Sequence, residues 1–222
     1  MRAGLVSAGA GNPPRTRPAT SVFPSLVPED IVLDAPIGSA QFLLAFAAGR
    51  MAARHALDPA AVTRALERRE QACSTGLGRG VAIPHARVDG LIAPATQFLR
   101  VHPAVHFGAP DGLPVTLFLV LLVPTDGDPE EHLVLLATAA QLFCESTFRT
   151  ELAAVRTPGS ARDLFAHWVA RPPSTAWRSM GAMRWWVSSP ARKSRSISRA
   201  SSSSAQSCWA SAASAARSLP MS

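Results

Sequence analysis

The hydrophobic pattern begins with one short apolar run followed by two stretches that have a helical period. Residues 31–33 form the apolar run and predict a strand. After Ser39, apolar residues recur every three or four positions between Phe42 and Met51, which predicts a helix. Asp58 followed by Pro59 is typical of a helix start, because Asp accepts N–H groups of the first turn and proline has no N–H to satisfy. This second helix is predicted to run through Leu66 to Arg69.

Three further apolar runs predict strands in the middle of the chain. Residues 81–83 form a run that ends at Pro84, and because proline cannot donate to a strand ladder we expect the strand to stop there. Residues 97–101 predict the next strand. Residues 115–123 are almost uninterrupted in their apolar character, which is typical of a strand buried on both faces.

The helical period returns in the last third of this region. Asp128 and Pro129 repeat the helix-start signal, and a shorter helix is predicted from Ser146. Ser160 with Asp163 three residues later is typical of a capping box, which predicts a last helix ending near Trp168. Strands that alternate with helices predict an α/β fold, in which helices cover both sides of a sheet.

The charge of the chain is divided unevenly between this patterned region and its flanks. The formal charge of the 222 residues is +7, which alone would favour nucleic acid or an anionic membrane as a partner. Residues 22–170, however, hold 11 arginines against 15 carboxylates, while residues 171–222 hold seven arginines and one lysine without any carboxylate. The patterned region is therefore mildly acidic, and the basic character belongs to the flanks.

The two flanks have no hydrophobic period. We expect residues 1–21 to be a disordered extension, residues 22–168 to form one domain, and residues 169–222 to be a low-complexity basic tail. One interpretation of the tail is a nucleic-acid-binding segment centred on residues 192–195. The other is translation out of the native frame of a GC-rich gene, which fits one lysine and no tyrosine in the chain.

Several classes of protein are disfavoured by composition. No run approaches the ~18 apolar residues of a membrane-spanning helix, and residues 3–10 are too weakly apolar for a signal peptide. The three cysteines, Cys73, Cys144 and Cys208, are too far apart in the sequence to indicate a disulfide framework or a zinc site. We therefore expect a cytoplasmic protein that has no resident metal or cofactor.

Residues 74–87 carry the most informative motif, Ser-Thr-Gly-Leu-Gly-Arg-Gly-Val-Ala-Ile-Pro-His-Ala-Arg. The alternating glycines Gly76, Gly78 and Gly80 permit close approach of backbone to backbone, or of backbone to a bound anion. His85 follows the apolar run directly, which predicts an imidazole at the rim of the sheet. A neutral imidazole nitrogen is nucleophilic at pH 7 and can form a phosphoramidate.

The segment from Arg69 to His85 resembles enzyme IIA of the bacterial phosphotransferase system, in the fructose/mannitol branch that includes the nitrogen-regulatory IIA proteins. The family pattern is Arg-Glu, a short spacer, Ser-Thr-Gly-(Ile/Leu)-Gly-X-Gly-(Val/Ile)-Ala-Ile-Pro-His, and the chain fits it at nearly every position. Cys73 stands where many relatives have glycine, and Gln71 replaces a common lysine. The resemblance implies a mixed sheet flanked by helices, with the active histidine at a strand end.

The resemblance also implies roles for individual residues. His85 would be the phosphorylated residue, Arg69 would hold phosphoryl oxygens, and His132 would lie close enough to donate to the phosphoryl group. Ser74 and Thr75 would orient the imidazole or donate to phosphate, although bonds within the turn explain them equally well. Arg79 and Arg87 flank the motif and are candidates for docking an acidic partner or phosphate.

We interpret the remaining histidines as structural or surface residues: His55, His102, His106 and His167. A metal bound by His85 and His132 is disfavoured, because the sequence has no third ligand at a spacing typical of a metal site.

The expected function is that of a phosphotransferase component, a phosphohistidine carrier with no cofactor. By the resemblance, the donor would be a histidine phosphocarrier protein of the HPr class, and the acceptor either a IIB component for sugar uptake or a regulated protein in nitrogen metabolism. The lack of a fused IIB or membrane segment favours regulation over fructose or mannitol transport. A nucleic-acid-binding protein acting through its tail is the outside alternative.

Overall fold

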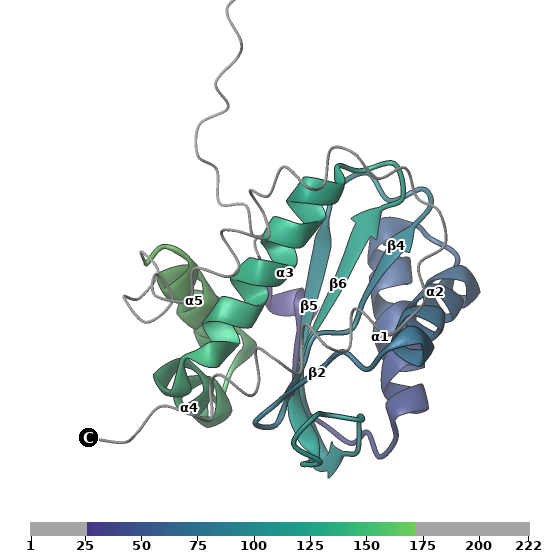
Figure 1. Ribbon diagram of the computed structural model, residues 1–222. Helices are drawn as coiled ribbons and strands as arrows, with labels where there is room; N and C mark the ends of the chain where they lie inside the picture. Colours follow the sequence, from purple (N-terminus) through teal and green to yellow (C-terminus); the bar gives the residue numbers. More distant parts are fainter. Residues whose placement is uncertain (1–25, 172–222) are drawn as a thin grey trace, which may run out of the picture. The chain divides into compact units, whose positions relative to one another are not determined.

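The computed structural model describes residues 26–171, and in this part of the chain helices lie on both faces of a single sheet (Figure 1). In chain order the elements are η1 (Pro28–Asp30), β1 (Ile31–Ala35), α1 (Ala40–His55), α2 (Pro59–Ala72), β2 (Gly76–Gly78), β3 (Val81–Ala82), β4 (His85–Val88), β5 (Ala95–Val105), β6 (Val115–Pro124), α3 (Pro129–Cys144), α4 (Ser146–Ala154) and α5 (Pro158–Val169). No helix in this range is long and apolar enough to cross a membrane.

The helix starts follow from local side chains, with one difference from the prediction. The carboxylate of Asp58 accepts the N–H groups of Ala60 and Ala61, and Asp128 caps α3 in the same way. The predicted capping box at Ser160 and Asp163 is wrong. Thr157 is the N-cap of α5 and accepts the Ser160 N–H at 3.1 Å. Pro158 explains the earlier start, because its fixed φ suits the first helical position and its missing N–H costs nothing there.

The sheet is mixed, in the order β1-β5-β6-β3-β2 with β4 also paired to β6. β5 and β6 are antiparallel, whereas β1 runs parallel to β5, and β3 and β4 run parallel to β6. This confirms the predicted fold class. β5 begins two residues before the predicted run and extends four residues past it, and the pattern gave no sign of the short strands β2 and β4.

The strand β3 ends before Pro84, as predicted, but pairing with β6 continues beyond this proline. It lacks a donor, but its carbonyl still accepts the Leu121 N–H at 2.9 Å, and pairing with β6 resumes at His85, which stands opposite Leu121. A proline removes only the donor half of a residue's ladder bonds. His85 is therefore the first residue of β4 rather than a residue beyond the sheet.

The long strand β6 separates two hydrophobic cores. Phe118, Val120 and Leu122 face the core built with α1 and α2, while the intervening residues of β6 face the core built with α3, α4 and α5. Figure 1 shows the two helical layers on opposite sides of the sheet. The pattern of residues 115–123 thus predicted a strand buried on both faces, and the structure confirms it.

The end of the described region extends slightly past the expected domain end. α5 continues to Val169, and the guanidinium of Arg171 lies 4.5 Å from the Trp168 ring centroid. The expectations for residues 1–21 and for nearly all of the basic tail, including residues 192–195, lie outside the described residues.

Candidate functional site

The side chain of His85 lies between residues contributed by helices from both layers. Arg69 is in the last turn of α2, and His132 is in the first turn of α3. The structure thus brings together the three residues predicted to carry the chemistry.

Both ring nitrogens of His85 are engaged. Nδ1 lies 2.9 Å from the carbonyl oxygen of Ile83, which can only accept, so Nδ1 carries the proton and donates. Nε2 lies 2.9 Å from Nε of Arg69, which can only donate, so Nε2 presents its lone pair. These two neighbours assign the Nδ1–H tautomer and leave the lone pair on Nε2.

The pKa of His85 is lowered from 6.5 to about 4, chiefly by burial and to a smaller extent by the charge of Arg69 and the neighbouring His132, against the bond to Ile83 that raises it. A histidine with this pKa is neutral at physiological pH, so its Nε2 lone pair is not masked by a proton. The electrostatics of the site therefore favour a nucleophile over a cation.

The guanidinium of Arg69 is held without any carboxylate. Its Nη1 donates to the carbonyl of Cys73 at 2.7 Å, in addition to the bond from Nε to His85. Among residues 26–171, Nη2 makes no hydrogen bond and no acidic side chain pairs with this arginine. Arg69 thus keeps donor capacity and a full positive charge beside the nucleophile, which suits it to an anion.

His132 meets His85 edge to face. The ring centroids are 5.6 Å apart with an interplanar angle of 72°. Burial lowers the pKa of His132, as do the charges of Arg87 and Arg69, and its Nε2 is buried without a hydrogen-bond partner in the described part of the chain. An unpaired buried polar atom costs free energy unless a ligand satisfies it, so this nitrogen is available to an additional group at the site.

The hydroxyls of Ser74 and Thr75 are both engaged away from the imidazole. The Ser74 hydroxyl donates to the carbonyl of Phe107 at 2.7 Å and accepts the Gly76 N–H. The Thr75 hydroxyl and its N–H both donate to the carboxylate of Glu70. These bonds hold the loop between α2 and β2 in place, and neither hydroxyl bonds to the His85 ring.

The glycines of the motif are required for close packing of the backbone. A Cβ on Gly76 would lie 2.7 Å from Cα of Ala109, and Gly78 has φ +86° with the carboxylate of Asp111 2.9 Å from where its Cβ would be. The same carboxylate accepts the Arg79 N–H at 2.6 Å. Of the two uses expected for these glycines, the structure shows the approach of backbone to backbone.

The two flanking arginines have different surroundings. Arg87 donates to the carbonyls of Thr125 and Gly127, and its charge acts on His132. Arg79 is exposed, and its charge acts instead on Cys144 at the C-terminal end of α3 and on Arg149 in α4. Arg87 therefore belongs to the surroundings of the site, and Arg79 does not.

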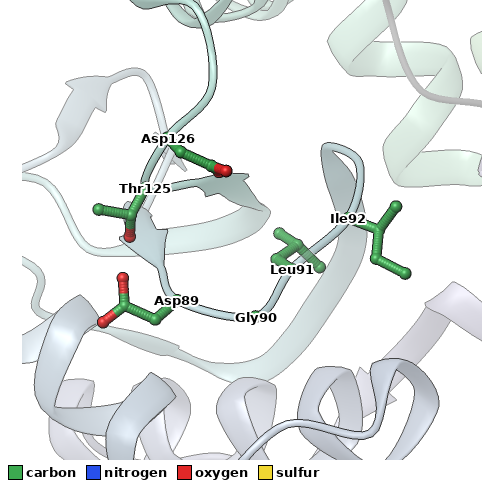
Figure 2. Close-up of a pocket in the computed structure, with 6 residues that line it drawn as sticks. All are labelled: Asp89, Gly90, Leu91, Ile92, Thr125 and Asp126. Carbon is green, nitrogen blue, oxygen red and sulfur yellow. The ribbon is translucent and has the colours of Figure 1, made fainter.

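A hollow lined by His132 adjoins a second hollow on the surface. The first, of about 360 Å³, is lined by His132 and Arg87 among others, and it shares Ile92 and Asp126 with the second, of about 600 Å³. Figure 2 shows the second hollow, with the carboxylates of Asp89 and Asp126 and the side chain of Ile92 among its lining. Ile92 is 97% exposed, so the surface next to the site combines acidic groups with one uncovered apolar side chain.

Sequence reasoning assigned no role to Glu70 or to the backbone carbonyl of Ile83. The position of Glu70 could have indicated a role, because a carboxylate in the last turn of a helix interacts unfavourably with the helix dipole unless other bonds compensate for it. Cys73, which replaces glycine, needs no special backbone, since its φ of −171° is extended. The described residues contain no group of three or more side chains that could hold a metal ion.

Comparisons with known proteins extend this picture. Residues 25–168 match the sequence model of a family described as "Phosphoenolpyruvate-dependent sugar phosphotransferase system, EIIA 2". The chain is 43% identical over 89 residues to a nitrogen regulatory protein of Pseudomonas aeruginosa, a match that covers 40% of this chain and 57% of that protein. It is 34% identical over 132 residues to the fructose-specific EIIA component of Haloferax volcanii, which covers 58% of this chain and 81% of that protein.

A solved structure shares the fold. The nitrogen regulatory protein IIA-Ntr of Neisseria meningitidis superposes with a TM-score of 0.61 at 38% identity, covering 63% of this chain and 95% of that one. IIA mannitol of Escherichia coli, solved in complex with phosphorylated IIB mannitol, has a TM-score of 0.56 at 20% identity, a likeness of fold alone. With the family match over residues 25–168, the chain belongs to the EIIA 2 family of the phosphoenolpyruvate-dependent sugar phosphotransferase system, whose members are phosphotransfer components.

Proposed function

We propose that this protein is a phosphohistidine carrier whose acceptor atom is Nε2 of His85. The observation that supports this most directly is the pairing of an unprotonated Nε2 with an arginine that has no carboxylate partner within residues 26–171. A nucleophilic nitrogen beside an unneutralised cation is the arrangement that phosphoryl transfer requires.

The transfer balances with a phosphohistidine as donor. The Nε2 lone pair of His85 forms a new P–N bond, and the electron pair of the breaking P–N bond returns to the donor's ring nitrogen. The Nδ1 proton of His85 stays in place, donating to the Ile83 carbonyl. The step itself consumes no nucleotide, because the donor already carries the activated phosphoryl group.

Arg69 and His132 would supply the contacts to the transferred group. In the unmodified protein Nε of Arg69 bonds to Nε2 of His85, so it must leave that atom as the P–N bond forms, and its donors then become available to phosphoryl oxygens. The unpartnered Nε2 of His132 would gain a phosphoryl oxygen as its acceptor when it carries a proton. Ser74 and Thr75 would contribute through the loop rather than by direct contact.

The partners of this site are inferred from the family. The donor is an HPr-type phosphocarrier protein, and the acidic and apolar surface around Ile92 suits a protein that approaches with basic and apolar side chains. The similarity to nitrogen regulatory proteins favours a regulatory role for the phosphorylated form. The similarity to a fructose-specific EIIA component supports the second candidate, transfer to a IIB component in sugar uptake.

The test is phosphorylation of the whole chain by a phosphorylated HPr-type donor. Wild type should gain one phosphoryl group that is labile in acid and stable in base, and His85→Ala should gain none. His55→Ala is the matched control, because His55 is exposed at the end of α1 and should be labelled like wild type. Undiminished labelling of His85→Ala would exclude the proposed acceptor.

A further inference from the structure

Glu70 receives two donors from a single residue of the next loop. The N–H of Thr75 lies 3.0 and 3.2 Å from its two carboxylate oxygens, and the Thr75 hydroxyl donates at 2.5 Å. Thr75 is only 6% exposed, so these bonds are largely shielded from water. Hydrogen bonds to an ionised group are roughly twice as strong as neutral ones, and Glu70 therefore anchors the loop that follows α2.

A chain of hydrogen bonds connects this anchor to Nδ1 of His85. The carbonyl of Thr75 accepts the Ile83 N–H at 3.0 Å, and the carbonyl of Ile83 accepts the Nδ1–H of His85 at 2.9 Å. This bond between Thr75 and Ile83 lies directly next to the short antiparallel pairing of β2 with β3, in which Gly76 stands opposite Ala82. The position of the Ile83 carbonyl thus depends on where Thr75 is held.

The same anchor reaches Nε2 of His85 by a second route. The loop held by Thr75 includes Cys73, whose carbonyl accepts Nη1 of Arg69 at 2.7 Å. That bond orients the guanidinium so that its Nε donates to Nε2 of His85. Both ring nitrogens of the nucleophile therefore meet partners whose positions depend on one carboxylate.

We propose that Glu70 is a positioning residue, which fixes His85 as the Nδ1–H tautomer and holds Arg69 at the reactive nitrogen by anchoring the Cys73–Thr75 loop. The inference rests on the proposed function for its consequence, the rate of phosphoryl acceptance. In the alternative tautomer, an Nε2–H would face the Nε–H of Arg69, and the reactive atom would have no lone pair to offer.

The experiment measures tautomer and rate separately in the full chain. Imidazole ¹⁵N chemical shifts of unphosphorylated protein should show His85 as a single Nδ1–H tautomer in wild type and as a mixture in Glu70→Ala. The rate of phosphoryl acceptance from an HPr-type donor should fall at least tenfold in Glu70→Ala. Glu70→Gln keeps one acceptor oxygen and should lie between the two.

The matched control is Glu67→Ala, on the same helix and with the same loss of charge, at a residue that makes no ion pair with another described residue. It should leave both tautomer and rate unchanged. A folded Glu70→Ala protein that keeps the pure Nδ1–H tautomer would overturn the proposal, and if that variant does not fold, a pure Nδ1–H tautomer in Glu70→Gln would overturn it. Because the tautomer is read without any donor, its outcome is independent of whether His85 is phosphorylated.

Discussion

Arg69 and Arg100 are two arginines on the same domain with opposite hydrogen-bonding arrangements. Arg100 lies in β5, 8% exposed, and its Nε and Nη2 bind the two carboxylate oxygens of Asp34 at 2.8 and 2.9 Å. Its Nη1 donates to three carbonyls at the end of α4, those of Leu152, Ala153 and Val155. Arg69 has two bonds from its guanidinium, one to a carbonyl and one to the nucleophilic nitrogen of His85.

The difference separates a structural arginine from one prepared for a ligand. Every nitrogen of the Arg100 guanidinium is occupied and its charge is neutralised, so it joins β1, β5 and α4 and has nothing left for a further anion. Arg69 has an unneutralised charge and a bond that must be broken before chemistry can occur. Residue type does not distinguish the two, whereas the number of satisfied donors and the presence of a carboxylate do.

The largest effect should come from removing the structural arginine. Arg100→Met should lower the free energy of unfolding by about 3–5 kcal/mol, because it leaves three carbonyls at the end of α4 without their donor and removes the partner of Asp34, whose side chain is 63% exposed. Urea unfolding measures this, and phosphoryl acceptance per folded molecule should be unchanged. The control is Arg162→Met, whose exposed pair with Asp163 should contribute less than about 0.5 kcal/mol. If Arg100→Met is as stable as wild type, Arg100 does not have the structural role that distinguishes it from Arg69.

The converse is expected at Arg69. Arg69→Ala should slow phosphoryl acceptance by roughly 2–4 kcal/mol of activation free energy, since a charge-assisted contact to the transition state is lost. Its melting temperature should stay close to that of wild type. Arg69→Lys should recover only part of the rate, because an ammonium cannot make a bidentate contact. If the stopped-flow rates of phosphoryl acceptance of both variants equal that of wild type, Arg69 does not contact the transferred group and is a structural residue like Arg100.

The smallest expected effect is a pH dependence of folding stability, which comes from His85 beside Arg69 and not from the Arg100–Asp34 pair. The pKa of His85 is lowered from 6.5 to about 4 by burial, so the unfolded chain binds its proton first as the pH falls. Stability from this group is therefore complete above pH 6.5 and declines between pH 6.5 and 4, by about 2 kcal/mol from pH 7 to 5. Arg100 lowers the pKa of Asp34 below 3.8, so that pair stays intact over the same range.

Unfolding of wild type and His85→Gln at pH 7 and pH 5 measures this contribution. The variant should lose about 2 kcal/mol less stability than wild type over that interval, because glutamine does not titrate. An equal loss in both proteins would show that His85 takes up its proton as readily in the folded state as in the unfolded chain.

Local signals predicted the elements that depend on local chemistry. The pairs Asp58-Pro59 and Asp128-Pro129 determined two helix starts, because the capping carboxylate and the proline act within one turn. The last helix was predicted to begin at Ser160, but Thr157 is its cap, because Pro158 suits the first helical position. The strand at His85 went unpredicted, because its four residues are stabilised by pairing with β6, more than 30 residues later in the chain.

The sequence predicted which residues form the candidate site, but it did not predict the hydrogen bonds that those residues make. The motif predicted His85 and Arg69, and the resemblance brought in His132, which the structure places beside them. The tautomer of His85 depends on the carbonyl of Ile83, and a backbone carbonyl has no signature in the sequence. Likewise the Ser74 hydroxyl is bonded to Phe107, a partner 33 residues away that only the fold brings close.

The division of the core by β6 has a consequence for how the site can be lost. Arg69 comes from a helix packed on one face of the sheet and His132 from a helix packed on the other, while His85 belongs to the sheet between them. Loosening either layer would separate one of these partners from the imidazole even while the other layer stayed folded. The rate of phosphoryl acceptance at His85 would then fall when either helical layer loosens. This one measurement would therefore test whether both layers of the domain are folded.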